Sequence, residues 1–385
     1  MSSDAISVLV VDDSALMRNL VGRIIEGADG LRLAGKAMNG KFALSKIPNL
    51  KPEVIVLDLE MPEMNGVEFL QACQEQGIDL PVIVLSAVAK KGAKITMEAL
   101  AAGAVDFIMK PQGAAPDEVR NIADHLIELV HSYGNRYRKR RGEPMVKPAK
   151  RRDVLKERPA EMPVNRKAPA EIRRPAAIPK DITPKDTPGQ LEIIAIGIST
   201  GGPNALRKVF SEISSDLPVP VLIVQHMPAG FTLEFARSLD RICPLEVKEA
   251  ADGDIIKKGR VLIAPGDFHI TVEKRKLANI LRLNQDPPMN GHRPSADVLF
   301  ESVAKNFGNR AMGVIMTGMG RDGARNIGEI YMAGGITLGQ DDASSVVYGM
   351  PRVAYENGFI TEQVAIEDMA EKISSWARKL TGGDE

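Results

Sequence analysis

The chain is poor in cysteine, in aromatic residues and in long apolar runs. Cys73 and Cys243 are its two cysteines, so it can build neither a disulfide framework nor a four-cysteine zinc site. A reducing cytoplasm is the compartment such a composition favours. No apolar stretch reaches the ~18–20 residues that cross a membrane, and the first residues lack a secretory signal pattern. We expect a cytoplasmic protein without membrane insertion.

The charge balance is even, with 50 basic and 50 acidic residues in 385, but it conceals a basic connector. Residues 136–190 contain 17 Lys and Arg against 7 Asp and Glu, and residues 142–190 contain nine prolines and no aromatic residue. Such a segment buries too little apolar surface to fold alone, which predicts an extended linker. It could act as a spacer, or contact acidic protein, nucleic acid or anionic lipid.

The connector divides the chain into three expected parts: a domain at 1–135, a linker at 136–190 and a second domain at 191–385. In the first domain, apolar strand-like runs alternate with helix-like stretches. The runs are at 6–11, 31–37, 53–59, 81–87 and 106–109. Five strands that each precede a helix predict a doubly wound α/β fold with a parallel sheet.

Polar residues stand where these strands end. Asp12 and Asp13 end the first strand, Asp58 ends the third, Ser86 the fourth and Lys110 follows the fifth. The carboxyl ends of parallel strands share one edge, where three carboxylates repel one another unless a cation lies among them. Hard oxygen ligands favour Mg²⁺, and a nearby hydroxyl and lysine would orient a phosphoryl group. For one aspartate alone, a helix cap is the alternative.

The motifs VDDS (11–14), LDLEMPEMNG (57–66), LSA (85–87) and DFIMKP (106–111) make residues 1–130 resemble a response-regulator receiver domain. The resemblance implies a flavodoxin-like (βα)5 fold with Asp58 as the phosphoacceptor. It implies Mg²⁺ ligands at Asp12, Asp13, Asp58 and the backbone carbonyl of Glu60. It also implies that Ser86 and Lys110 contact the phosphoryl group and that Phe107 is the switch aromatic.

The second domain has further buried-strand patterns at 193–199, 219–225, 260–265 and 311–318, with a hairpin pattern at 269–283. They predict a second doubly wound α/β domain whose sheet is mainly parallel. The first strand runs into GISTG (197–201), which matches the nucleophile-elbow pattern around Ser199. A dinucleotide loop is disfavoured, because Ser199 stands where its second glycine belongs. A glycine-rich turn with a serine helix cap is the remaining alternative.

A nucleophilic serine needs a base and an orienting acid. Among five histidines, position favours His226, which ends a buried strand as Ser199 does. For the acid, Asp322 in TGMGRDG (317–323) follows another buried strand, and three other aspartates compete on sequence alone: Asp252, Asp267 and Asp297. The order Ser, His, Asp differs from that of α/β-hydrolases, so a triad here would belong to another fold.

Residues 191–380 resemble the catalytic domain of the chemotaxis protein-glutamate methylesterases, the CheB family. The matching motifs are IGISTGGP (196–203), QHMPAGFT (225–232), APGDFHITV (264–272), HRPSADVLFESVA (292–304) and TGMGRDGA (317–324). The resemblance implies a triad of Ser199, His226 and Asp322, with the backbone N–H of Met319 as an oxyanion donor and Thr200 beside the pocket.

The resemblance also implies an activity and its partners. The reaction would be hydrolysis of glutamate γ-methyl esters on chemoreceptors, with deamidation of receptor glutamines, through an acyl-enzyme. A chemotaxis histidine kinase would be the phosphodonor. Mg²⁺ would serve receiver phosphorylation, and the esterase reaction would need no cofactor. We expect a monomer whose unphosphorylated receiver packs near the Ser199 edge.

Two other classes of function compete. A receiver-controlled scaffold or binding protein could carry a degenerate esterase domain, although the complete Ser, His and Asp set speaks against it. A transcriptional regulator would need a helix-turn-helix after the linker, where residues 191–385 show buried strands instead. No zinc finger or basic zipper is present either, so we expect no DNA binding.

Overall fold

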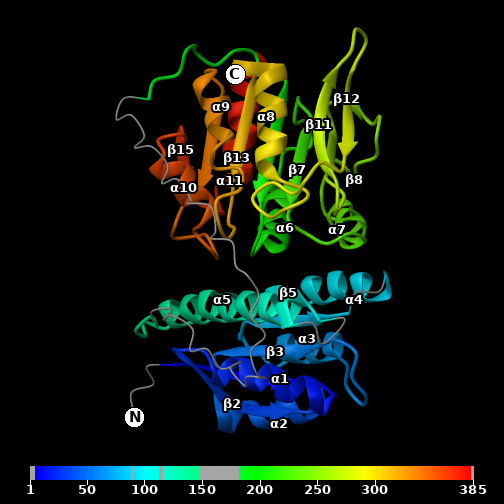
Figure 1. Ribbon diagram of the computed structural model, residues 1–385, viewed down its shortest axis with the longest axis vertical. Coiled ribbons are helices and arrows are strands. Elements are labelled where there is room, and N and C mark those ends of the chain that lie inside the picture. The colour runs from blue at the N-terminus through cyan, green and yellow to red at the C-terminus, as the bar shows by residue number, and fades with distance from the viewer. Residues whose placement is uncertain (1–4, 88–89, 112–115, 147–181, 383–385) are drawn as a thin grey trace, which may run out of the picture.

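The computed structural model of the protein describes residues 5–87, 90–111, 116–146 and 182–382. Two α/β bodies lie one above the other, and the blue-to-cyan N-terminal body faces the green-to-red C-terminal body through α5, β5 and α4 (Figure 1). Most of the expected linker, residues 147–181, lies outside the described residues. No helix in the described ranges is both long and apolar enough to cross a membrane.

The N-terminal body is a five-stranded parallel sheet in the order β2-β1-β3-β4-β5. The strands are β1 (Ile6–Val11), β2 (Leu31–Ala37), β3 (Val54–Asp58), β4 (Val82–Ser86) and β5 (Asp106–Met109). The helices are α1 (Ala15–Glu26), α2 (Gly40–Leu50), α3 (Gly66–Glu75), α4 (Lys90–Ala101) and α5 (Pro116–Arg140). This confirms the doubly wound fold predicted from the alternating pattern.

Local signals in the sequence explain where these helices begin. The side chains of Ser14 and Asn39 accept hydrogen bonds from the backbone N–H groups of the first turns of α1 and α2. Asn65 and Glu68 form a reciprocal capping box at the start of α3. These caps hold the segments that follow β1 and β3, where the acidic residues lie.

Helix α5 extends into the expected linker, up to Arg140. Arg138 on its last turns is buried, and its guanidinium binds the carboxylate of Glu53 and the carbonyl of Ala5. Burial by itself would raise the pKa of Glu53, but the bonds from Arg138 and Ser7 outweigh it and lower that pKa. The buried pair ties the basic start of the connector to the N-terminal sheet.

The C-terminal body contains a seven-stranded parallel sheet in the order β15-β14-β13-β6-β7-β10-β8. Its strands are β6 (Ile193–Ile198), β7 (Val221–Gln225), β8 (Glu246–Glu249), β10 (Arg260–Ile263), β13 (Ala311–Ile315), β14 (Ile336–Gln340) and β15 (Glu362–Val364). A smaller antiparallel sheet holds β9 (Ile255–Ile256), β11 (His269–Lys274) and β12 (Asn279–Asn284). The expected hairpin is thus β11 and β12.

Helices cover both faces of the large sheet (Figure 1). They are α6 (Gly202–Glu212), α7 (Phe231–Asp240), α8 (Ala296–Phe307), α9 (Ile327–Met332), α10 (Met350–Glu356) and α11 (Met369–Thr381), with a 3₁₀ turn at Gly308–Arg310. After β6 the chain builds β7, β8 and β10 on one side and later β13, β14 and β15 on the other. The order therefore reverses between β6 and β13, the place where ligands bind in open α/β sheets.

The two bodies meet at the start of α6 and α7. Asn204 Nδ2 donates to the carbonyls of Ala104 and Val105, at 2.9 and 3.0 Å. The rings of Phe107 and Phe231 stack in parallel with centroids 5.3 Å apart. Buried apolar side chains from both bodies form one continuous cluster. The face formed by α4, β5 and α5 therefore lies against the edge that follows β6 and β7.

Candidate active site and receiver pocket

Three polar side chains converge at the carboxyl ends of β6, β7 and β13. Ser199 directly follows β6, His226 directly follows β7, and Asp322 lies in the loop after β13. Backbone bonds tie these strand ends together: Ser199 N donates to Thr317 O at 3.0 Å, and His226 N donates to Ile198 O at 3.1 Å. The parallel sheet thus brings together residues that are far apart in the sequence.

The side chains form a hydrogen-bonded chain. Ser199 Oγ lies 3.0 Å from His226 Nδ1, and His226 Nε2 lies 2.8 Å from Asp322 Oδ2. When Nε2 carries a proton, it donates a hydrogen bond to Asp322, and Nδ1 is free to accept the proton of the Ser199 hydroxyl. Ser199 and His226 are half-buried and Asp322 is buried. The arrangement can move a proton from a hydroxyl that a substrate can reach.

The carboxylate of Asp322 is surrounded by donors. It accepts from Ser295 Oγ and Ala296 N, both at 2.6 Å, and from Asn290 Nδ2 at 3.0 Å. Burial alone would raise the pKa of Asp322, but the bonds from His226 and Ser295 outweigh it and hold the pKa well below its usual range. Asp322 is therefore an anion that can orient the imidazole and stabilise it when it is charged.

Of the three competing aspartates, Asp252 and Asp267 pair with arginines, and Asp297 lies beside Asp322, with its backbone N–H 3.4 Å from Asp322 Oδ1. Asp252 pairs with Arg282 at 2.8 Å, and Asp267 pairs with Arg293 at 2.6 Å. Asp297, on α8, accepts from Asn290 and Asn326. Of these candidates, Asp322 is the one that reaches His226.

Several residues that support this site were not singled out from the sequence. Gln225 Nε2 donates to the carbonyls of Ser199 and His226, at 3.0 and 3.1 Å, and so braces both. A polar residue at the end of a buried strand was the available signal. Asn290 and Ser295 gave a weaker signal, since they lie in a loop and reach Asp322 through tertiary structure alone.

Gly318 brings the loop after β13 against Ser199. A Cβ built on Gly318 would lie 2.8 Å from Ser199 Cβ, so a side chain at this position would clash with the serine. Met319, the expected oxyanion donor, follows directly and is half-buried. Thr200 is buried, and its carbonyl accepts from Thr317 Oγ1 at 3.0 Å.

The acidic residues of the N-terminal body also gather at one strand edge. Asp12, Asp13 and Asp58 each offer a carboxylate oxygen within 4.8 Å of the others. Lys110 Nζ lies 2.7 Å from Asp58 Oδ2 and 3.0 Å from Asp12 Oδ2. Burial raises the pKa of Asp58 even though Lys110 opposes the shift. A small cluster of hard oxygen donors with a lysine beside it fits the predicted Mg²⁺ site.

The other expected receiver residues lie around this cluster. A cavity of about 150 Å³ is lined by Asp13, Asp58, Glu60, Ser86 and Lys110, among others. Glu60 N donates to Asp58 Oδ1 at 3.3 Å. The Ser86 hydroxyl is 2.6 Å from Thr96 Oγ1 on α4. Phe107 lies on β5 at the interface instead, and 9% of its surface is exposed.

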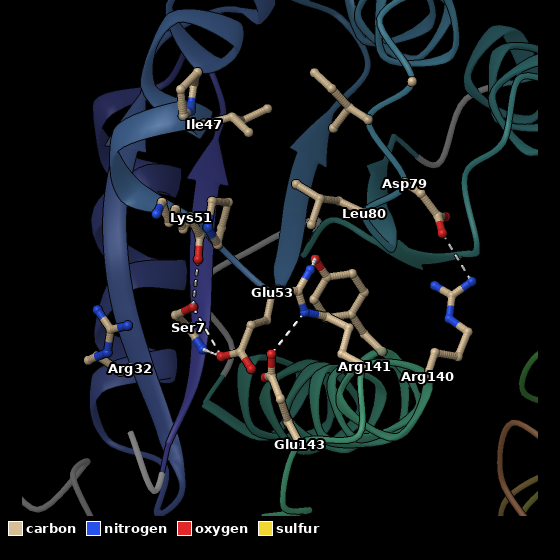
Figure 2. A pocket seen from close by; sticks show the side chains of 15 residues that line it. Ser7, Arg32, Ile47, Lys51, Glu53, Asp79, Leu80, Arg140, Arg141 and Glu143 are labelled. Atoms are coloured by element: carbon tan, nitrogen blue, oxygen red, sulfur yellow. Dashed lines mark hydrogen bonds and ion pairs between the residues drawn. The ribbon is translucent and has the colours of Figure 1, made fainter. Parts of the chain in front are cut away.

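A larger hollow of about 880 Å³ lies at the opposite, amino-terminal ends of β1, β3 and β4 (Figure 2). Its charged groups are largely paired with one another: Arg140 with Asp79 at 3.2 Å, and Arg141 with Glu143 at 2.8 Å. Ser7 N donates to Glu53 at 2.7 Å. The acidic edge that carries Asp58 lies at the other ends of these strands, so the hollow is separate from both sites.

Comparison with known proteins matches both bodies. Residues 194–373 match the family described as CheB methylesterase, and residues 8–123 match the response regulator receiver domain. A protein-glutamate methylesterase/protein-glutamine glutaminase of Treponema pallidum is 51% identical over 98% of each chain. This chain belongs to the protein-glutamate methylesterase/protein-glutamine glutaminase family. The family assignment confirms the resemblance seen in the motifs of both domains.

Two further proteins are similar to this chain. The enzyme of the same description from Treponema denticola is 52% identical over 97% of this chain and 99% of its own. The crystal structure of the Thermotoga maritima CheB methylesterase catalytic domain is 35% identical, covers 48% of this chain and 98% of its own, and has a TM-score of 0.47.

Proposed function

We propose that the protein hydrolyses glutamate γ-methyl esters on chemoreceptors, and deamidates receptor glutamines, under the control of receiver phosphorylation. The observation that carries the proposal is the hydrogen-bonded chain from Ser199 through His226 to Asp322. It stands at the reversal point of the sheet, in a chain of the methylesterase family. The hydrogen-bonded set of all three side chains speaks against a degenerate esterase domain.

The proposed reaction follows from the geometry. Ser199 Oγ attacks the ester carbonyl while its proton passes to His226 Nδ1. Asp322 accepts from Nε2 and stabilises the imidazolium that forms. A tetrahedral oxyanion develops, and the backbone N–H of Met319 is the expected donor to it, an effect worth about 3–4 kcal/mol. His226 then gives its proton to the leaving oxygen, and methanol departs.

The acyl-enzyme is then hydrolysed. His226 takes a proton from water, which attacks the acyl carbon. His226 then returns a proton to Ser199 Oγ as the bond to the serine breaks, and the released acid ionises to a glutamate carboxylate. With a glutamine side chain the same steps release ammonia in place of methanol. Deamidation and demethylation therefore need the same groups and no bound metal in the C-terminal domain.

The N-terminal domain supplies the control. Asp58 would accept the phosphoryl group. Asp12, Asp13, Asp58 and the carbonyl of Glu60 would hold Mg²⁺, which would supply positive charge to offset that of the phosphodonor. Lys110 would follow the new charge, which is roughly −1.5 to −2. The Ser86 hydroxyl would exchange Thr96 for a phosphoryl oxygen. A histidine kinase is the expected phosphodonor.

Rearrangement around Asp58 would release the interface. Phe107 and Asp106 both lie on β5 and both contact the edge that carries Ser199. The unphosphorylated receiver would limit access of a receptor helix to this edge, and phosphorylation would favour an open arrangement. A shift from 1:99 to 99:1 would need about 5.5 kcal/mol of differential stabilisation.

The deciding experiment measures methanol release from methylated receptor membranes, with and without a small phosphodonor and Mg²⁺. We expect turnover that rises with the phosphodonor and is abolished in a folded Ser199→Ala variant. Substantial methanol release by Ser199→Ala would refute the assigned nucleophile. If the wild type released no methanol in either state, the function of the C-terminal domain would be reassigned to deamidation, hydrolysis of another ester or a scaffold role.

A further inference from the structure

A second histidine lies against the proposed base. The rings of His226 and His292 are stacked, with centroids 3.9 Å apart and planes within 10° of parallel. His292 is half-buried, and its side chain forms no hydrogen bond with any residue in the described ranges. Its ring packs on the face of the His226 imidazole.

The loop that carries His292 is held in a defined shape. Met289 and His292 exchange two backbone hydrogen bonds, at 3.1 and 2.9 Å, around the dipeptide Asn290–Gly291. Asn290 and Gly291 both have positive φ, 53° and 82°, as a tight type I′ turn requires. Asn290 then binds Asp322 at 3.0 Å. One turn thus supports the acid through Asn290 and covers the base through His292.

The stacking contact fixes the plane of the His226 ring, which its two hydrogen bonds do not fix. The bonds from His226 to Ser199 and to Asp322 leave opposite sides of the ring, so they hold two atoms and allow the ring to tilt about the line between them. A flat ring packed at 3.9 Å against one face blocks that tilt. A tilt would swing the lone pair of Nδ1 out of line with the serine hydroxyl, and small misalignments of reacting groups can cost about 100-fold in rate.

The electrostatics agree with this role. Burial and the neighbouring His226 lower the pKa of His292 to about 4, and the charge of Asp322 opposes the shift only weakly. His292 is therefore neutral near pH 7. The face of a neutral aromatic ring attracts a cation, so it favours His226 in its protonated form. A protonated His292 would repel that form.

We propose that His292 positions the catalytic base: its neutral ring fixes the plane of the His226 imidazole and stabilises that imidazole when it carries a proton. The role extends the proposed esterase mechanism and rests on it. His292 does not touch the nucleophile and takes no proton from the substrate.

The test compares three substitutions in the full chain, activated with phosphodonor and Mg²⁺ on a methylated receptor fragment. His292→Ala removes the ring and should lower kcat at least tenfold while KM changes little. His292→Phe keeps a flat, uncharged ring and should restore most of kcat. Met289→Ala, at the start of the same turn, alters an exposed side chain and should behave as wild type.

The pH profile provides a second readout. Without the stacked ring, the His226 imidazole loses the contact on its face, so the acid limb of the kcat profile of His292→Ala should differ from that of wild type. His292→Phe should resemble wild type. A role in packing alone would lower thermal stability without shifting the acid limb of the pH profile.

Each result decides the proposal. A wild-type kcat for His292→Ala, a Phe variant as slow as the Ala variant, or a change confined to KM would overturn it. If His292→Ala fails to fold, His292→Gln serves as the ringless variant. Ser199→Ala is assayed in parallel: retained turnover there would refute the proposed function, whereas an inactive Ser199→Ala beside a fully active His292→Ala would refute the inference about His292 alone.

Discussion

The backbone N–H of Gly201, two residues after Ser199, donates a 2.9 Å hydrogen bond to Asp106 Oδ2 on the receiver. Gly201 caps helix α6, which has no side-chain cap of its own. The receiver therefore supplies the carboxylate that the positive end of this helix favours. The same strand places Phe107 on Phe231, the first residue of α7. Adjacent residues of β5 thus hold the starts of two catalytic-domain helices.

Asn204→Ala should raise basal turnover. The amide of Asn204 makes two hydrogen bonds across the interface, each worth about 0.5–1.5 kcal/mol, so their loss should increase the open fraction several-fold to about 100-fold. The rate with phosphodonor should stay unchanged.

Methanol release, measured with and without phosphodonor, checks both expectations. Lys208→Ala is the matched control on α6, because Lys208 pairs with Glu212 of its own helix. An unchanged basal rate in Asn204→Ala would show that this contact does not restrain the domains.

Inhibition by the receiver should weaken as pH rises through about 6. Burial raises the pKa of Asp106 to about 6, although Phe107 N and Gly201 N donate to it. Separation of the domains would relieve that burial and return the pKa toward its ordinary value. The closed state therefore binds a proton more tightly, so acid favours closure, and this advantage is lost above pH 6.

The ratio of basal to phosphodonor-activated turnover isolates this effect, because the pH dependence of the chemistry itself cancels. The ratio should rise between about pH 5 and pH 7.5 in the wild type. It should be flat in Asp106→Asn, whose side chain does not titrate. A ratio that changes equally in both proteins would assign the pH dependence to another group.

Strand ends were the most informative part of the sequence. Ser199 and His226 each follow a buried run, and parallel strands gather their carboxyl ends at one edge, so their proximity could be predicted before the structure. Short strands such as β8, with the sequence EVKE, carry too little apolar character to stand out. The contact of Asp106 with Gly201 was beyond prediction, because it depends on how two separately folded bodies dock.

Asp322→Asn should lower kcat by about 10⁴-fold, as the same change of the orienting acid does in a Ser-His-Asp protease. The asparagine amide cannot accept at every bond that the carboxylate holds, and it does not stabilise an imidazolium. Single-turnover methanol release measures the loss. Asp267→Asn, on an exposed loop paired with Arg293, is the control. A drop of less than tenfold in Asp322→Asn would assign the orienting role elsewhere.

Removal of Mg²⁺ should abolish regulation through the N-terminal domain without affecting the esterase reaction of the C-terminal domain. Asp12, Asp13 and Asp58 would lose the cation that allows a negative phosphodonor to approach them. A chelator should therefore abolish stimulation by the phosphodonor and leave basal methanol release intact. Asp58→Asn should give the same result even with Mg²⁺ present. Loss of basal turnover on chelation would place a metal in the esterase reaction itself.

Gly318→Ala should inactivate the enzyme with a modest loss of stability. A Cβ at this position would lie 2.4 Å from Met350 Sδ and 2.8 Å from Ser199 Cβ. Met350 has a flexible side chain, but Ser199 is held through its backbone bond to Thr317 O. The added methyl group must displace the serine, which would break its 3.0 Å contact with His226. We expect kcat to fall about 100-fold and stability to fall by about 1–3 kcal/mol. Steady-state turnover and thermal unfolding measure the two effects. Gly320→Ala is not a suitable control, because Gly320 has a φ of +80°, a backbone conformation that would strain an alanine. Full activity in a folded Gly318→Ala would show that the loop after β13 can retreat without disturbing the nucleophile.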